Sequence, residues 1–143
     1  MAGAPVGVVD CAAEVGVVAG SQWVFTAVPN APGSNSTIAL RSNPALCVGT
    51  DAAGMLVLVA CNAQDATQLW GWRFDGIAPD GERSSSIVNV ASGNCLDVYN
   101  EVPDVGAQMD AYKCSGRGNQ AFFFDFTAGE IANEATSTCL GVC

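Results

Sequence analysis

The chain of 143 residues contains no histidine, and its five lysines and arginines are far outnumbered by 14 aspartates and glutamates. Without histidine, serine–histidine and cysteine–histidine catalysis are excluded within this chain. The formal net charge of −9 argues against a nucleic-acid partner, because phosphate backbones are bound by clustered Lys and Arg. No apolar run reaches the roughly 20 residues that span a bilayer, so we expect no membrane insertion.

The rest of the composition is that of a folded protein. Half of the residues are hydrophobic and 16 are glycine, unlike a disordered acidic tail, and the length predicts a single domain, 1–143. Seven cysteines are many for a reduced cytosolic protein. The sequon Asn35-Ser36-Thr37 follows Pro32 and Gly33, which indicate an exposed loop, although so short a motif also arises by chance. Together the cysteines and the sequon favour a secreted or luminal protein.

Three related stretches indicate an internal repeat with a period of about 45–50 residues. In each, a glutamine stands just before bulky aromatic residues: Gln22-Trp23, Gln68-Leu69-Trp70 and Gln120-Ala121-Phe122. Each stretch follows a cysteine, and further cysteines open three matching segments: Cys47-Val48-Gly49, Cys95-Leu96-Asp97 and Cys139-Leu140-Gly141.

The repeats read as β-structure throughout. Short runs such as Leu56–Val59 and Phe122–Phe124 are rich in β-branched or aromatic residues, and turn-forming residues separate such runs. Three repeats of four strands predict an all-β fold, a β-trefoil, because a propeller needs at least about four blades. Units 37–85 and 86–129 are complete, whereas 130–143 plus 1–36 are two half-units. We expect them to combine, so that the chain ends fall inside one repeat; a fragment of a longer trefoil array is the alternative.

The repeats also suggest how six of the seven cysteines pair, which sequence alone does not normally decide. Cys47 and Cys61 flank one hairpin, and Cys95 and Cys114 occupy the same two places in the next unit. Equivalence then pairs Cys11 with Cys139. Cys143 is left over, either free, linked to another chain or domain, or paired within a longer parent. Zinc is the alternative use of these cysteines, but no CxxC pair or histidine accompanies them, so we expect no metal and no cofactor.

These motifs resemble those of the ricin-B-type lectin domains, which are β-trefoils. The resemblance covers essentially the whole chain and is strongest from Ser86 to Phe124. Gln68-Leu69-Trp70 matches the family's Gln-x-Trp signature, the third unit replaces the Trp with Phe122, and Gln22-Trp23 lacks the spacer residue. The resemblance implies that the signature aromatics build the core. We therefore expect the following residues to be buried: Trp23, Trp70, Trp72 and Phe122 to Phe124.

The resemblance also implies a sugar site in the third unit. In the family, an Asp after Cys-Leu takes sugar hydroxyls, an aromatic two residues before the second cysteine stacks on the sugar, and an Asn before the signature Gln adds a hydrogen bond. The corresponding residues here are Asp97, Tyr112 and Asn119, and Gln120, directly after Asn119, is counted with them as a candidate site residue. Asp110 lies two residues before Tyr112, on the same strand face by alternation, and would add a second acceptor.

The other two units lack these groups. Gly49 and Gly141 stand at the Asp position, and Val59 and Val9 stand at the stacking position. Asn62 and Asp65 read as loop polar residues without partners. The sequence therefore predicts one competent site.

Three functions fit this pattern. The first is a non-enzymatic lectin module that binds glycans or glycoproteins, with galactose-type sugars implied by the resemblance, free or appended to a larger secreted protein. The second is a trefoil that binds protein as an inhibitor or structural subunit. The third is a glycosidase, for which Asp97 and Asp110 are the only carboxylate pair that we place on one hairpin.

Overall fold

The computed structural model describes residues 3–11, 22–28, 35–77, 83–98, 104–115, 118–125, 129–133 and 138–142. Cys143 lies outside these residues. The described segments form two 3₁₀ helices, η3 (Ala66–Gln68) and η5 (Gly118–Gln120), and a series of β-strands. The strands are β1 (Val6–Asp10), β2 (Trp23–Ala27), β3 (Ser36–Leu40), β4 (Asn43–Thr50), β5 (Leu56–Ala60), β6 (Trp70–Ile77), β7 (Arg83–Asn89), β8 (Cys95–Asp97), β9 (Asp110–Tyr112), β10 (Phe122–Asp125), β11 (Glu130–Asn133) and β12 (Thr138–Val142).

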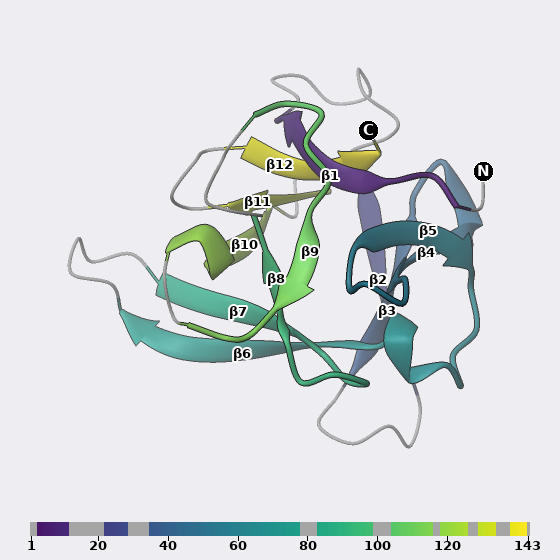
Figure 1. Ribbon diagram of the computed structural model, residues 1–143, viewed down its shortest axis with the longest axis horizontal. Coiled ribbons are helices and arrows are strands. Elements are labelled where there is room, and N and C mark those ends of the chain that lie inside the picture. Colours follow the sequence, from purple (N-terminus) through teal and green to yellow (C-terminus); the bar gives the residue numbers. More distant parts are fainter. Residues whose placement is uncertain are drawn as a thin grey trace.

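The strands fall into three groups of four that pair in the same way. Within each group the first strand pairs with the second, as in β3–β4, β7–β8 and β11–β12. The second pairs with the third, as in β4–β5, β8–β9 and β12–β1. The fourth pairs with the first strand of the next group, as in β2–β3, β6–β7 and β10–β11. This threefold arrangement is the β-trefoil that the sequence predicts, and Figure 1 shows β12 lying alongside β1 from the other end of the chain.

The second and third strands of each group have the same register. Each first cysteine faces the residue two positions before the second cysteine: Cys47 faces Val59, Cys95 faces Tyr112 and Cys139 faces Val9. The disulfides are Cys47–Cys61, Cys95–Cys114 and Cys11–Cys139, each with a Cα–Cα distance of 5.0 Å. These are the three pairs expected from the repeats.

The core is centred on one aromatic residue from each group. Trp23, Trp70 and Phe122 are each 1% exposed. The indole Nε1 of Trp23 donates to the Leu140 carbonyl at 3.0 Å, and that of Trp70 donates to the Val48 carbonyl at 3.0 Å. Trp23 is therefore the equivalent of Trp70. It follows that Gln22, directly before Trp23, occupies the position of the spacer residue and not that of the signature glutamine.

Two of the aromatic residues expected in the core are exposed instead. Trp72 is 40% exposed and Phe123 is 49% exposed. Phe123 alternates to the face of β10 opposite Phe122. Trp72 lies two residues beyond Trp70, at the rim of the core, where its ring contacts Phe25 with centroids 5.6 Å apart. The prediction that both would be buried was wrong. Phe123 lies on the outer face of its strand, and Trp72 shares the face of Trp70 but lies beyond the end of the packed core.

The sequon does not lie in an exposed loop as expected. Ser36 and Thr37 begin β3 and are 8% and 7% exposed. Thr37 faces Thr26 of β2, and Ser36 faces Trp70 of β6. Two neighbouring strands thus bury the end of the motif, while Asn35 directly precedes β3. Pro32 and Gly33, on which the loop prediction rested, lie outside the described residues.

Candidate functional site

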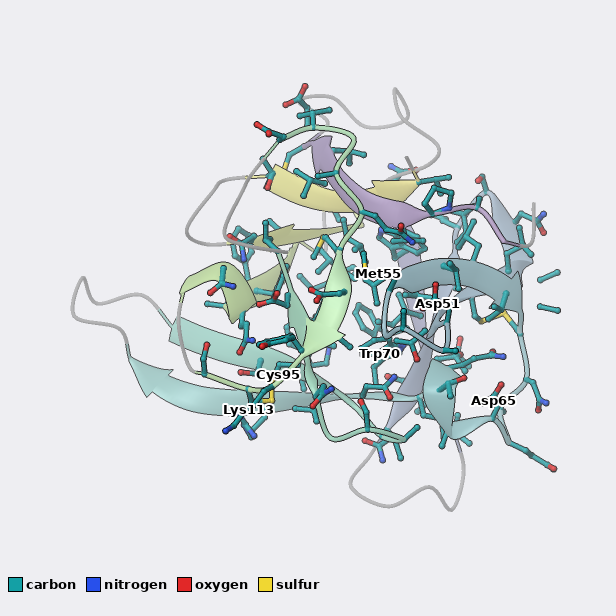
Figure 2. All side chains as sticks on the ribbon, in the orientation of Figure 1. Asp51, Met55, Asp65, Trp70, Cys95 and Lys113 are labelled. Carbon is teal, nitrogen blue, oxygen red and sulfur yellow. A yellow bond between two sulfur atoms is a disulfide. The ribbon has the colours of Figure 1, made fainter. Side chains whose placement is uncertain are left out.

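The β8–β9 hairpin brings two aspartates face to face. Asp97 pairs directly with Asp110, and Cys95 pairs with Tyr112. Between them, Leu96 pairs with Ala111, and both point into the core, where Leu96 is fully buried. Side chains alternate along a strand, so Asp97, Asp110 and Tyr112 share the opposite face of the hairpin. The hairpin is visible in Figure 2, where Cys95 marks the start of β8 and Lys113 follows β9.

The helix η5 covers this face with two amides. The Asn119 Nδ2 donates to Asp97 Oδ1 at 2.6 Å, and the Gln120 Nε2 donates to the same oxygen at 3.1 Å. Asp97 is 4% exposed and Gln120 is 2% exposed. Hydrogen bonds to a carboxylate are about twice as strong as those between neutral groups, so the two amides hold the Asp97 carboxylate in one orientation.

Gln120 also has a structural role that is repeated in the second unit. Its Oε1 accepts from the Ser115 N–H at 2.7 Å, and its Nε2 donates to the Lys113 carbonyl at 2.9 Å. Gln68 makes the same two bonds, accepting from the Asn62 N–H at 2.8 Å and donating to the Ala60 carbonyl at 3.1 Å. The signature glutamine therefore ties the third strand of its unit to the following helix. In both units it also reaches an aspartate: Gln68 donates to Asp65 of the neighbouring turn at 3.4 Å, whereas Gln120 donates to Asp97 on β8.

The loop acid of the second unit is part of this local structure. The Asp65 Oδ1 caps η3, accepting from the Thr67 N–H at 3.0 Å and from the Thr67 hydroxyl at 2.7 Å. The Thr67 hydroxyl, followed by its backbone N–H, lowers the pKa of Asp65. Asn62 accepts from the Gln64 N–H at 3.0 Å. The sequence reading of Asn62 and Asp65 as polar residues without partners was wrong, since each closes a turn.

Asp110 is buried beside Asp97 without a full set of partners. It is 5% exposed, and within the described residues its Oδ1 has no hydrogen-bond partner. Burial raises the pKa of Asp110 to about 7, and the hydrogen bond with Asp97 and the charge of Asp97 add to the effect. The Asn119 Oδ1 is also buried without a partner in the described part of the chain. Two unsatisfied oxygens therefore flank the Asp97 carboxylate, and such groups cost free energy until they are hydrogen-bonded.

Tyr112 supplies the apolar surface next to these polar groups. Its side chain is 62% exposed, on the same face of the hairpin as Asp110. An exposed aromatic ring beside oriented carboxylate and amide groups suits a ligand that has both hydroxyl groups and an apolar face.

The equivalent hairpins of the other two units carry no such groups. In the second unit Gly49 faces Val57, at the positions of Asp97 and Asp110. In the unit formed by both chain ends, Gly141 faces Gly7. The position of Tyr112 is taken by a valine in both units. The carboxylates and the aromatic ring thus occur together in the third unit alone among these three hairpins.

Neither a metal site nor a membrane span is evident among the described residues. No group of three or more Cys, Asp or Glu side chains there is arranged to hold a metal ion. No helix in the described segments is long and apolar enough to cross a membrane.

Comparison with solved structures finds a similar fold in a designed protein with threefold symmetry, ThreeFoil. The likeness has a TM-score of 0.53 at 21% sequence identity and covers 68% of this chain and 66% of ThreeFoil. The hemolytic lectin CEL-III aligns over 99% of this chain and 50% of its own, with a TM-score of 0.47 and 15% identity, values that do not establish a common fold. The chain thus spans slightly less than two thirds of the first protein and half of the second.

Comparison with curated protein sequences finds no match. The family model for ricin-type beta-trefoil lectin domain-like proteins matches residues 66–143, which is more than half of the chain and includes the β8–β9 hairpin and η5. The strand pairing, the repeated glutamine contacts and this match lead to one conclusion: the chain belongs to the ricin-type β-trefoil lectin domain-like family.

Proposed function

We propose that residues 1–143 act as one non-enzymatic, carbohydrate-binding lectin module with a single site, in the third repeat, for galactose-type sugars. The observation that supports this most directly is that Asp97, Asn119 and Tyr112 lie together on the β8–β9 hairpin and η5. The preference for galactose-type sugars is taken from the family resemblance. The three disulfides support an oxidising, extracellular location, either as a free lectin or as part of a larger secreted protein.

In this proposal each residue has one task. The Asp97 carboxylate accepts hydrogen bonds from neighbouring sugar hydroxyls, and Asn119 adds a further polar contact. Tyr112 stacks against the apolar face of the sugar ring. Gln120 is almost fully buried, so its task is to orient Asp97 through the hydrogen bond to Asp97 Oδ1. A shallow site of this kind gives affinities in the range of about 1 mM, so useful avidity requires several sites or attachment to another domain.

The geometry argues against the glycosidase alternative. A retaining enzyme needs its two carboxyl groups about 5–5.5 Å apart, and an inverting enzyme needs roughly 6.5–9.5 Å. Asp97 and Asp110 face each other directly across β8–β9 and are 4% and 5% exposed, an arrangement that does not favour a glycosidic bond held between the two carboxyl groups.

A glycan array followed by retention on galactose–agarose tests the proposal. We expect the wild-type chain to be retained and released by free galactose, and Tyr112→Ala to lose retention while remaining folded, because its side chain is exposed. Asp97→Asn places an amide against the two amide donors and should also abolish retention. Asp65→Asn, an acid exchanged in the second unit, is the matched control and should bind normally. An array without any bound glycan would favour the protein-binding alternative.

A further inference from the structure

The two facing aspartates pose an electrostatic problem that the lectin role alone does not resolve. Asp97 and Asp110 are direct partners across an antiparallel pair and are 4% and 5% exposed. Like charges directly opposite each other destabilise a strand pair, and burial increases this cost because water no longer screens them. A proton or a cation must therefore neutralise one of the two carboxylates.

The surroundings of Asp110 favour a proton. From β8 it faces Asp97, and from η5 the neutral amides of Asn119 and Gln120 face the same pair. On its other side, Met55 forms an isolated backbone bridge with Asp110. Asp51, in the turn before Met55, directs its carboxylate to the N–H groups of Ala53 and Met55 (Figure 2).

Among the residues that the structure describes, no basic side chain shifts the pKa of Asp110. The charged group that acts on Asp110 is the carboxylate of Asp97. Arg73 reaches Cys95, with Nη2 4.0 Å from Sγ, and the contact of Lys113 with η5 is made by its backbone carbonyl. The described residues also contain no group of three metal-binding side chains.

We propose that Asp110 is a positioning residue that carries a proton, donates it to the Asp97 carboxylate, and thereby makes the site bind its glycan best when this proton is present. The inference rests on the proposed lectin function for its effect on binding, but not for the proton itself. It reverses the role expected from the sequence, since Asp110 acts as a hydrogen-bond donor to Asp97 and not as a second acceptor.

A neutral Asp110 carboxyl adds a donor to those that already hold the Asp97 carboxylate. Asn119 and Gln120 both donate to Asp97 Oδ1, and the protonated Asp110 adds a further hydrogen bond to that carboxylate. Loss of the proton from Asp110 removes that bond and places a second negative charge beside the first. The Asp97 carboxylate is then pushed away from the position in which it meets the ligand.

The expected pH dependence follows from the pKa of Asp110, which burial and Asp97 raise from 3.8 to about 7. At pH 8 about one molecule in ten retains the proton, so the apparent affinity for the glycan should fall about tenfold between pH 5 and pH 8. The same group affects folding. Because the folded state holds the proton more tightly than the unfolded chain, the free energy of unfolding should fall as the pH rises from about 4 to above 7.

The test compares the wild-type chain with Asp110→Asn, which keeps an N–H donor toward Asp97 and cannot ionise. Lactose, as a soluble galactoside, is titrated at pH 5, 6, 7 and 8 and followed by NMR chemical shifts. We expect the affinity of the wild type to drop about tenfold over this range and that of Asp110→Asn to stay constant near the wild-type value at pH 5. Equal wild-type affinity at pH 5 and pH 8, or a folded Asp110→Asn that does not bind, would overturn the proposal. Loss of wild-type binding on addition of a chelator would also overturn it, because a cation would then be the neutralising group.

A second measurement separates this proposal from the lectin function. Urea unfolding of both proteins is measured from pH 4 to pH 8 without any sugar. A wild-type stability that falls relative to Asp110→Asn as the pH rises supports the proton on Asp110 even if no sugar binds, in which case only the proposed lectin function has failed. A constant difference between the two proteins would refute the proton.

Discussion

In the second repeat, Gly49 and Val59 fill the positions that correspond to the candidate site of the third repeat. A Cβ atom built at Gly49 would lie 2.9 Å from the Val59 Cγ2 and 3.4 Å from the Gln68 Cγ. In the third repeat Asp97 and Tyr112 stand at the positions of Gly49 and Val59. The second repeat therefore lacks the site for a steric reason as well as a chemical one, since the valine and the glutamine occupy the space that a carboxylate would need.

This contact predicts that Gly49→Ala is destabilising. The added methyl group must displace Val59 or Gln68, and overpacking of this kind costs about 1–3 kcal/mol. Val59→Ala in the same chain removes the obstructing methyl groups, so the double variant should recover part of that loss. Urea unfolding of the two single variants and the double variant measures the coupling. Additive effects of the two substitutions would show that Gly49 and Val59 do not compete for this space.

The three tryptophans should differ sharply in exposure and in their contribution to stability. Trp70→Ala removes a core side chain that donates to the Val48 carbonyl and should cost about 3–5 kcal/mol. Trp72→Ala removes a rim contact with Phe25 and should cost roughly 1 kcal/mol. Acrylamide should quench mainly the fluorescence of Trp72, so Trp72→Phe should abolish most of the quenching. Equal quenching of the wild type and Trp72→Phe would contradict the exposure of this residue.

The cysteines made it possible to predict which strands lie together, whereas the aromatic residues did not define the core. A disulfide requires Cα atoms about 4.4–6.8 Å apart, so three cysteine pairs in phase with three repeats determine which strands lie together. Trp72 and Phe123 are as hydrophobic as Trp70 and Phe122, and nothing in the residue types marks where the packed layer ends. Trp72 is exposed because it lies two residues beyond Trp70 along its strand, and Phe123 is exposed because it lies on the face of β10 opposite Phe122.

The residues of the candidate site could be proposed from the sequence, but the relation between Asp97 and Asp110 could not. Twelve residues separate these two aspartates, from Val98 to Met109, and a loop of that length does not define a register as a two-residue turn does. The structure supplies this register: Cys95 pairs with Tyr112, and two residues further along the hairpin Asp97 pairs with Asp110. Burial, together with the closeness of Asp97, raises the pKa of Asp110, and this is why we propose that it acts as a donor and not as an acceptor.

The disulfide between the two ends of the chain should contribute most to stability. Cys11 and Cys139 are 128 residues apart, whereas Cys47 and Cys61 are 14 apart. In the chain-entropy account a longer closed loop restricts the unfolded chain more, which gives about 5 kcal/mol for the first bridge and about 3 kcal/mol for the second. Urea unfolding of the two paired Cys→Ser variants should therefore differ by about 2 kcal/mol. A larger loss from the Cys47–Cys61 bridge would show that native contacts outweigh the unfolded-state effect.

The cap formed by Asp65 should stabilise the protein at neutral pH and lose this effect in acid. Its carboxylate accepts two hydrogen bonds from Thr67, and replacement of a capping residue by alanine costs about 1 kcal/mol. Because these bonds lower the pKa of Asp65 in the folded state, the stabilising charge is fully present above the unfolded value of 3.8 and disappears as the pH falls through the lower, folded value. Asp65→Asn keeps a capping oxygen without a charge and is the matched control. Thermal unfolding should show the wild type more stable than Asp65→Asn at pH 7 and equal to it near pH 2, whereas a gap that persists in acid would mean that the charge of Asp65 does not contribute.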